Sequence, residues 1–224
     1  MTKVETFLAG QGRASRALYY VVRAIVAGFT RLWTRMAIEG REHIPKHGAF
    51  VLAPVHRSNM DTPISSCVTR RRMRFMGKDS LWKGGPISWL LSSLGGFPVA
   101  RGTADREALH RCIAVLEAGE PLVLFPEGER KSGPTVQPLF DGAAYVALKA
   151  GVPIVPVGIG GSEGVMPKGA KFILPKKVHV IVGPPILPPP SVTDGRVPRS
   201  AVRQVTAELH ATLQQLYDEA SKRL

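Results

Sequence analysis

Residues 49–55 of this chain read AFVLAPV, and residues 56–61 continue it as HRSNMD. The first seven residues are an apolar run of strand length, which indicates a buried strand. His56 follows that run directly, and Asp61 comes five residues later. A five-residue step on one helix turns by about 500°, so the two side chains could not share a helical face. They can meet only if His56 lies in a loop before the helix, where a base and its orienting carboxylate would stand at a strand end.

Pro63 supports a helix that begins shortly after His56, because proline is tolerated in the first helical turn. Either Ser58 or Asp61 is then the expected N-cap. The motif by itself leaves two interpretations open. His56 and Asp61 form a catalytic pair, or Asp61 only caps the helix and His56 is a hydrogen-bonded structural histidine.

Outward from this motif, short apolar runs alternate with stretches of helical spacing. The apolar runs lie at 49–55, 73–77, 121–125, 153–159 and 178–182, and the helical stretches lie at 79–94, 103–118 and 140–150. This alternation predicts an α/β domain, which we expect to hold a mixed central sheet flanked by helices. The proline-rich residues 183–190 predict an extended connector to a final amphipathic helix near 198–222.

A length of 224 residues suffices for one hydrophobic core, so we expect a single domain. It should have three parts. Residues 1–40 are the expected N-terminal basic amphipathic helical element, residues 41–190 the α/β core, and residues 191–224 a C-terminal helix packed on that core.

The chain carries 30 Lys and Arg against 17 Asp and Glu, a net charge of +13. This charge favours an anionic partner, such as nucleic acid, acidic lipid headgroups or small phosphate compounds. Residues 1–41 mix seven basic and two acidic side chains with many apolar ones, as membrane-surface helices do. The apolar stretch 17–29 contains Arg23 and is shorter than the roughly 20 residues that a span needs. We expect this segment to lie on a bilayer without crossing it, or alternatively to pack on the protein's own core.

Two further basic clusters are the run RRRMR at 70–74 and a set of four lysines, Lys168, Lys171, Lys176 and Lys177. Basic runs are usually solvated faces, and this interpretation applies most strongly to the lysines. The arginine run also motivates an alternative of another class, a nucleic-acid-binding module. Aromatic residues make up only 7% of the chain and do not punctuate that run, so stacking platforms are missing and no nucleic-acid partner is expected.

Other catalytic and metal patterns are weak in this sequence. There is no GxSxG motif, and Cys67 and Cys112 lack CxxC or metal-ligand spacing, so we expect ordinary reduced thiols of a cytosolic protein. His43 and His47 have the spacing of a metal pair on a helix, but Pro45 between them would break that helix. The sequence therefore predicts neither a covalent nucleophile nor a metal site, and no signal peptide begins the chain.

Three cations follow apolar runs and are expected to project from strand ends into one crevice. They are Lys78, Arg101 and Arg130. Guanidinium groups match phosphate oxygens bidentately, and an ammonium adds a compact point charge. The sequence therefore predicts a site for a dianionic phosphate, although each cation taken singly is more often a surface group.

Four blocks in order resemble the motifs of the glycerophospholipid acyltransferases, the family typified by 1-acyl-glycerol-3-phosphate (lysophosphatidic acid) acyltransferases. The blocks are HRSNMD at 56–61, resembling H-x4-D, then GGFPVAR at 95–101, FPEGER at 125–130 and VPIVPV at 152–157. The resemblance covers roughly residues 35–185. Four motifs in order are far more specific than any one of them.

The resemblance implies that His56 is the general base for an acceptor hydroxyl and that Asp61 holds its tautomer. The hydroxyl would attack the thioester of acyl-CoA or acyl carrier protein directly, so the acyl donor is a co-substrate and no cofactor is expected. Lys78, Arg101 and Arg130 would bind the acceptor's phosphate.

The same resemblance implies supporting roles for four other residues. Glu127 and Gly128 would shape the phosphate pocket, and Pro153 and Pro156 would support the wall of an acyl channel. The N-terminal helix would dock on an anionic membrane surface. The expected place is the cytoplasmic face of the cell membrane, as a peripheral or monotopic protein.

Three positions depart from the family pattern: Glu129 where threonine is common, Pro98 where an aromatic or aliphatic residue is frequent, and Asp141 where many members have lysine. Glu129 opposes a dianion if it faces the pocket, or pairs with a neighbouring cation if it faces away. These departures bear on the acceptor headgroup. The predicted product is phosphatidate, and the alternatives are acylation of glycerol-3-phosphate, another lysophospholipid or a glycolipid, or a catalytically silent lipid-binding protein.

Overall fold

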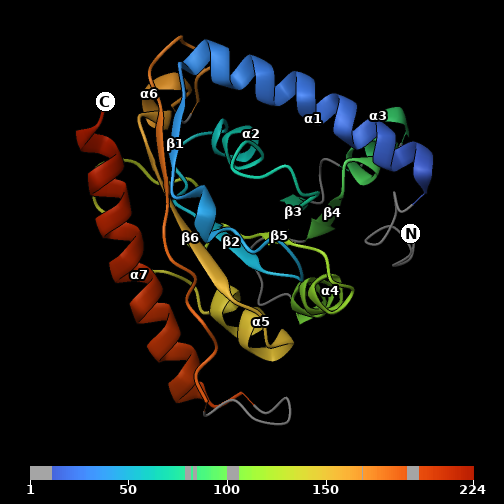
Figure 1. The fold of residues 1–224 in the computed structure, drawn as a ribbon, viewed down its shortest axis with the longest axis vertical. Coiled ribbons are helices and arrows are strands. Elements are labelled where there is room, and N and C mark those ends of the chain that lie inside the picture. The colour runs from blue at the N-terminus through green and yellow to red at the C-terminus, as the bar shows by residue number, and fades with distance from the viewer. Residues whose placement is uncertain (1–11, 79–81, 83–84, 100–105, 168, 191–196) are drawn as a thin grey trace.

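The structure of the protein is a computed structural model that describes residues 12–78, 82, 85–99, 106–167, 169–190 and 197–224. These residues form a seven-stranded sheet with helices on both faces (Figure 1). Its order is β1-β7-β6-β2-β5-β3-β4. The strands are β1 (Ala37–Glu39), β2 (Val51–Pro54), β3 (Arg74–Lys78), β4 (Gly96–Val99), β5 (Leu122–Val123), β6 (Ile154–Gly160) and β7 (His179–Val182).

The sheet is mixed, and its central strand is β2. The five strands from β6 to β4 run parallel, whereas β7 is antiparallel to β6 and parallel to β1. All residues of β2 are buried. A parallel strand covered on both faces needs a continuous apolar run, and residues 49–55 supply one.

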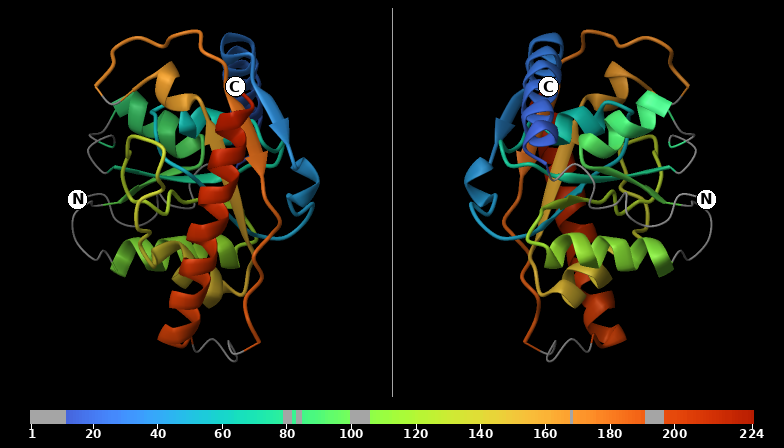
Figure 2. Two further views of the ribbon diagram at one scale, coloured as in Figure 1. Left: turned by 90° about the vertical axis from the view of Figure 1, so that its left-hand side faces the viewer. Right: turned by 90° about the vertical axis from the view of Figure 1, so that its right-hand side faces the viewer.

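Seven helices are described, together with a 3₁₀ turn at Arg41–His43. They are α1 (Arg13–Thr34), α2 (Asp61–Ser65), α3 (Gly85–Ser93), α4 (Arg106–Glu117), α5 (Gly142–Ala150), α6 (Ser162–Val165) and α7 (Arg199–Lys222). In Figures 1 and 2, α1, α2 and α3 lie on one side of the sheet, and α4 and α5 lie on the other. The central strand is thus covered from both sides.

The C-terminal helix α7 lies directly on β6 because two glycines of that strand have no side chain. A Cβ atom on Gly158 would lie 2.4 Å from the Leu216 carbonyl carbon, and one on Gly160 would lie 2.5 Å from that of Ala220. The helix buries one face on the sheet, with Leu209 and Leu213 fully or almost fully covered. The expected helix packed on the core is therefore present.

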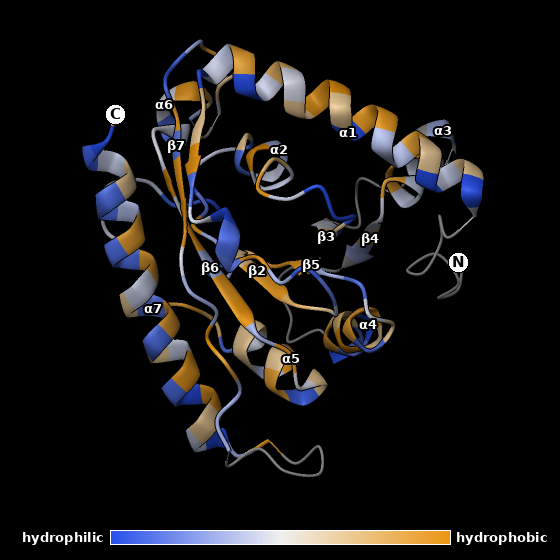
Figure 3. Ribbon diagram, viewed as in Figure 1, coloured by the Kyte–Doolittle hydropathy of each residue, from blue (hydrophilic) through white to orange (hydrophobic). Residues whose placement is uncertain are grey.

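The N-terminal helix α1 faces the protein largely with polar contacts. The Tyr19 hydroxyl accepts a hydrogen bond from the Met73 N–H, and the Arg31 guanidinium donates to the Cys67 carbonyl at 2.8 Å. The opposite side is apolar and exposed, and we call it the outer stripe: Ala17, Tyr20, Val21, Ala24, Ile25, Gly28, Phe29, Leu32 and Trp33. Figure 3 shows the hydrophobic bands that repeat along this helix. The helix packs on the protein, as the alternative interpretation expected, but the described residues leave its apolar face uncovered.

The expected α/β class with a mixed central sheet is confirmed. Two strands do not stand out as apolar runs in the sequence. Pro98 interrupts β4, which is tolerated because β4 is an edge strand. The three residues of β1 belong to the sheet, so the sheet begins before the boundary expected at residue 40. None of the described helices is both long and apolar enough to cross a bilayer.

Candidate active site

Two neighbouring strands end at the same edge of the sheet and bring the first and third sequence motifs together. His56 follows β2, and residues 125–128 follow β5, which pairs with β2 in parallel. The chain leaves β2 through α2 on one face and leaves β5 through α5 on the other (Figure 1). Neighbouring strands with connections on opposite faces open a crevice at their carboxyl ends, which is where α/β sheets bind ligands.

His56 and Asp61 form a buried pair at this edge. The His56 Nδ1 atom lies 3.0 Å from the Asp61 Oδ2 atom, and the side chains are 11% and 0% exposed. His56 lies in the loop before α2, as the five-residue spacing required. The expected N-cap was wrong: Met60 occupies that position, and neither Ser58 nor Asp61 caps the helix. Asp61 instead accepts hydrogen bonds from the backbone N–H groups of Arg57 and Ser58, so its carboxylate holds the loop that precedes it.

This pairing decides which ring nitrogen of His56 can act as a base. A carboxylate only accepts hydrogen bonds, so the Nδ1 that faces Asp61 carries the proton of the neutral imidazole. The lone pair is then on Nε2. The ring also stacks on Phe125, with the ring centres 4.0 Å apart and the planes 20° apart. The imidazole is therefore held in one tautomer and one plane.

Glu127 holds the backbone of His56 rather than facing solvent. Its Oε1 accepts a hydrogen bond from the His56 backbone N–H at 3.0 Å, and the Arg57 Nη1 lies 2.7 and 2.8 Å from its two oxygens. The same Nη1 donates to the His56 carbonyl at 3.1 Å. Arg57 and Glu127 are at most 1% exposed. One buried ion pair thus fixes both backbone polar groups of His56, and a part in shaping a phosphate pocket stays a prediction for Glu127.

Arg57 and Tyr217 belong to this site, and sequence reasoning missed both. The Arg57 guanidinium lies over the ring of Tyr217, 5.0 Å from its centre. Tyr217 comes from α7, and burial raises the pKa of its hydroxyl. The only feature of the sequence that could have indicated Tyr217 is its place on the apolar face of the last predicted helix. Arg57 had no such feature, because an arginine within a polar motif is normally taken for an exposed cation.

Gly128 makes the turn after Glu127 in a conformation that favours glycine. Its φ angle is +70°, and a Cβ atom there would lie 2.7 Å from the Phe140 ring. The turn of the FPEG segment back toward β2 therefore favours glycine at this position. Gly128 shapes the turn itself, and its part in a phosphate pocket stays a prediction.

Only part of the predicted phosphate-binding site lies within the described residues. Lys131 donates its backbone N–H to the His56 carbonyl at 2.9 Å, which places the neighbouring Arg130 at the crevice. The side chain of Arg130 forms no hydrogen bond or ion pair with the described residues. Lys78 ends β3, so its backbone lies at the same edge of the sheet, and Arg101 lies outside the described residues.

Glu129 faces outward and is paired with a neighbouring cation. Its carboxylate lies 2.8 Å from the Lys131 ammonium, and its side chain is 61% exposed. Of the two orientations that the sequence left open, the structure has the one in which the carboxylate is neutralised nearby.

Of the two prolines expected at an acyl channel, Pro156 lies in the sheet and Pro153 directly precedes it. The Pro153 carbonyl accepts the Val51 N–H, at the amino end of β2 and thus at the opposite edge from His56. Pro156 pairs with Ala53 in the buried middle of β6, and its ring packs close to Gly183. Both have packing roles here, and a role in a channel wall stays a prediction.

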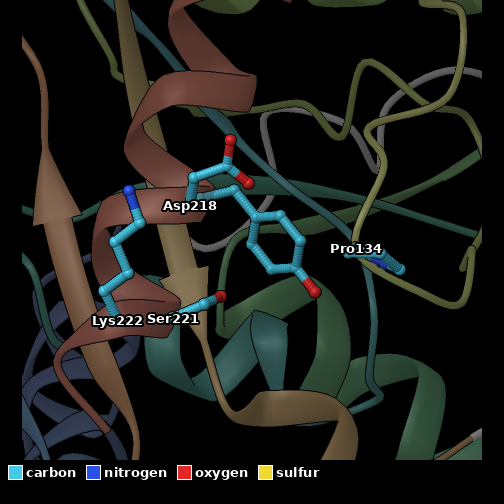
Figure 4. Close-up of a pocket in the computed structure, with 5 residues that line it drawn as sticks. Pro134, Asp218, Ser221 and Lys222 are labelled. Carbon is cyan, nitrogen blue, oxygen red and sulfur yellow. The ribbon is translucent and has the colours of Figure 1, made fainter.

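A surface cavity of about 350 Å³ lies behind the site, between the loop at Pro134 and the last turns of α7 (Figure 4). It is lined by Pro134, Tyr217, Asp218, Ser221 and Lys222. Tyr217, which lines this cavity, also lies under the Arg57 guanidinium.

The arginine run at 70–74 is used inside the protein. Arg71 donates to the carbonyls of Pro45 and Gly48, Arg72 lies over the Tyr19 ring, and fully buried Arg74 pairs with Glu120. The desolvation that this burial brings lowers the pKa of Arg71 and Arg72. Among these four arginines only Arg70 is exposed, so the run that motivated a nucleic-acid-binding module does not form a basic surface.

The remaining candidates from the sequence have structural contacts. His43 bonds to the Val182 carbonyl at 2.8 Å, and Cys67 and Cys112 are both buried. Within the described ranges, no group of three or more His, Cys, Asp or Glu side chains could hold a metal ion.

Comparison with known proteins adds three findings. The sequence model of the acyltransferase family matches residues 35–160. A chloroplastic 1-acyl-sn-glycerol-3-phosphate acyltransferase from Brassica napus is 30% identical over 153 residues, which cover 66% of this chain and 44% of that protein. A 1-acyl-sn-glycerol-3-phosphate acyltransferase from Bacillus subtilis is 27% identical over 151 residues, which cover 66% of this chain and 72% of that protein. This chain thus spans less than half the length of the Brassica protein.

The fold has a similar solved structure. The 1-acyl-sn-glycerophosphate (LPA) acyltransferase from Thermotoga maritima matches with a TM-score of 0.72 and 26% sequence identity, over 92% of this chain and 84% of that one. The match extends well beyond residues 35–160 and includes most of the described helices and strands.

Proposed function

The chain belongs to the acyltransferase family, and from this premise we propose that it transfers a fatty acyl group to the free hydroxyl of 1-acyl-glycerol-3-phosphate, which forms phosphatidate. The acyl donor is acyl-CoA or acyl carrier protein, and no other cofactor takes part. The names of the similar proteins from Brassica napus, Bacillus subtilis and Thermotoga maritima support this choice of acceptor.

The observation that carries the proposal is the His56–Asp61 pair at the end of the central strand. With Nδ1 protonated toward Asp61, Nε2 is free to accept the proton of the acceptor hydroxyl. The backbone contacts from Glu127 and Arg57 hold this imidazole in place. Preorganised bases of this kind do not have to be ordered during the reaction.

The reaction needs one proton transfer in each direction. Nε2 takes the hydroxyl proton while the oxygen attacks the thioester carbonyl carbon. When the tetrahedral intermediate collapses, the carbon–sulfur bond breaks, and the imidazolium returns its proton to the departing thiolate. The products are the ester and a free thiol, and no acyl-enzyme forms.

Arg130, Lys78 and Arg101 are proposed to bind the acceptor's phosphate. Arg130 is the best supported, because it is partly exposed and adjoins the residue that bonds to His56. The pairing of Glu129 with Lys131 removes the main electrostatic objection to a dianion at this place. Charge-assisted bonds from arginine to phosphate are among the strongest that proteins form.

We also propose that α1 lies on a bilayer, at the cytoplasmic face of the cell membrane. The support is the outer stripe, an apolar face more than four turns long that the described protein leaves uncovered. Helix α1 contains four arginines and no acidic residue, which suits anionic lipid headgroups. The acceptor is itself an amphiphile, so a docked enzyme would meet it where it resides.

A direct assay tests the activity. Purified protein is given lysophosphatidate with acyl-CoA or acyl carrier protein, and phosphatidate is measured by mass spectrometry. His56→Ala should reduce the rate by about 10²–10⁴-fold, the typical value of a general base. Absence of product with the wild type would reject the activity, and a full rate in His56→Ala would reject the base.

The choice of acceptor needs a second comparison. Arg130→Ala should raise KM for lysophosphatidate and leave KM for the acyl donor unchanged, because the substitution removes a binding partner of the acceptor's phosphate only. Glycerol-3-phosphate, another lysophospholipid and a glycolipid are offered in parallel. Faster turnover of a phosphate-free glycolipid would move the assignment to that acceptor.

A further inference from the structure

Residues 171–177, KFILPKK, form an exposed loop that carries apolar side chains between lysines. Phe172 is 78% exposed and Leu174 is 45% exposed. Lys171 and Lys176 are exposed as well. Two large apolar side chains at the tip of a loop lose favourable burial energy unless something covers them.

The loop is attached to the end of α1. The Trp33 indole donates a hydrogen bond to the Ile173 carbonyl at 3.2 Å, and Arg35 donates to the Pro175 carbonyl at 3.4 Å. Trp33 is the last member of the outer stripe. The loop therefore continues the same apolar surface past the end of the helix. Figures 1 and 2 both show it beside α1 at the top of the molecule.

The charge around the loop indicates what covers it. Residues 166–178 contain four lysines and no acidic residue, and α1 contributes four arginines and no acid. A second copy of this chain would bring the same positive charge against this surface. An anionic bilayer offers both an apolar interior for Phe172 and Leu174 and opposite charge for Lys171 and Lys176.

We propose that the 171–177 loop is a second membrane contact, which inserts Phe172 and Leu174 into an anionic bilayer beside α1. The inference rests on the proposed function for its purpose, since a bilayer would hold the acceptor. It assigns a binding role to lysines that would otherwise be taken for a solvated face.

The loop also connects the bilayer to the catalytic segment. The Ser58 hydroxyl, within the HRSNMD motif, donates to the Met166 carbonyl at 2.8 Å. The Leu174 N–H donates to the Val165 carbonyl at 2.8 Å, so the loop folds back on the same short helix α6. Contact with the membrane at Phe172 therefore sets the position of the catalytic loop relative to the headgroups.

Vesicle sedimentation tests the proposal with the full chain. Binding is measured to phosphatidylcholine vesicles with and without phosphatidylglycerol. Each basic side chain near an anionic surface strengthens binding about fivefold, so the double variant Lys171→Gln/Lys176→Gln should bind anionic vesicles roughly thirtyfold more weakly. Phe172→Ala/Leu174→Ala should lose about tenfold or more on the same vesicles. Lys46→Gln and Leu187→Ala, exposed elsewhere, are the matched controls and should bind as the wild type does.

A rate measurement separates this proposal from the proposed function. Both double variants should acylate a short-chain lysophosphatidate dissolved as monomers at the wild-type rate, and should be slow only when the acceptor is in vesicles. If the wild type acylates neither acceptor, the proposed function fails while the vesicle result still decides the membrane contact. Unchanged binding in both double variants overturns the proposal. So does a wild-type dimer in sedimentation velocity that Phe172→Ala/Leu174→Ala dissociates, because a second copy would then cover the loop.

Discussion

The Arg57–Glu127 pair stands behind His56 with almost no exposure to water. Burying two charges costs several kcal/mol of folding free energy. Their mutual attraction offsets this cost only if their remaining hydrogen bonds are satisfied. Here Arg57 also donates to the carbonyls of His56 and Thr135, and Glu127 also accepts from the backbone of His56 and Gln137. Among the described residues the Arg57 Nε has no hydrogen-bond partner, so most but not all of these groups are satisfied. The pair is therefore a framework for the backbone around the base.

Arg57→Met should lower the free energy of unfolding by about 3–5 kcal/mol, because Glu127 would remain buried without its partner. Urea unfolding followed by circular dichroism measures this change. Arg203→Met, at an exposed position of α7, is the matched control and should cost less than about 0.5 kcal/mol. Equal stability of the two variants would show that the buried pair has no such role.

Gly128→Ala should destabilise the protein for two separable reasons. The left-handed backbone costs an L-residue about 1–2 kcal/mol, and the new methyl group would overlap the Phe140 ring. In a Phe140→Ala background the overlap disappears and only the backbone cost remains. Thermal unfolding of the four proteins in this cycle separates the two contributions. If Gly128→Ala lowers the unfolding free energy equally with and without the Phe140 ring, the overlap makes no contribution.

The pairing of His56 with Asp61 could be predicted at this scale, whereas the residues behind it could not. The five-residue step from His56 to Asp61 excludes a shared helical face, and a strand run before it places the histidine in a loop. Arg57 finds its partner 70 positions later. No local pattern records a contact of that separation.

At the scale of elements, the close packing of α7 on the sheet depends on the two glycines of β6, Gly158 and Gly160. Gly158→Ala would place a methyl group 2.4 Å from the Leu216 carbonyl carbon, and backbone cannot move aside as a side chain can. We expect a loss of about 1–3 kcal/mol or more in unfolding free energy. Gly164→Ala in α6 meets only the Lys176 side chain at 3.8 Å and is the matched control. A harmless Gly158→Ala would mean that α7 is free to move off the sheet.

Tyr217 connects α7 to the active site, so α7 should influence catalysis. Tyr217→Leu removes the ring beneath Arg57 and should lower kcat roughly 10–100-fold with little change in either KM, because small displacements of a base are costly. Tyr217→Phe keeps that ring and should retain most of the rate. A purely structural role would be indicated if Tyr217→Leu lost stability but kept kcat.

Elements with strong periodicity were predictable, and short ones were not. Residues 198–222 show the spacing of an amphipathic helix, and α7 spans Arg199–Lys222. Strand β1 has three residues and takes its identity from its pairing with β7. A segment that short has no period of its own, so its state depends on tertiary contacts.

For the whole molecule, the net charge of +13 should make vesicle binding depend on salt. Raising the salt from about 0.1 M to 1 M shortens the screening length from roughly 10 Å to 3 Å. Binding to anionic vesicles should fall steeply over this range, while acylation of a monomeric acceptor should change much less. Vesicle sedimentation across a salt series measures the first effect. Salt-independent binding would indicate attachment by apolar contact alone.

The sequence predicted the α/β class because apolar runs and helical stretches alternate along it. It did not predict the order of the strands. That order depends on which runs pair, and the antiparallel insertion of β7 between β1 and β6 has no local signature. The orientation of the outer stripe could not be predicted either. The spacing of residues shows that α1 has an apolar face, but the contacts of Tyr19 and Arg31 that turn this face away from the core are long-range.

The pairing of β1 with β7 also has a consequence for synthesis on the ribosome. Glu39 of β1 bonds to His179 of β7, 140 positions later, at 2.8 Å. At about 5–20 residues per second, β7 is made on the order of ten seconds after β1. During that interval the strand that follows α1 has no partner, while the apolar side of the helix is already complete. If α1 binds a bilayer as proposed, it can therefore reach the lipid surface before the sheet closes.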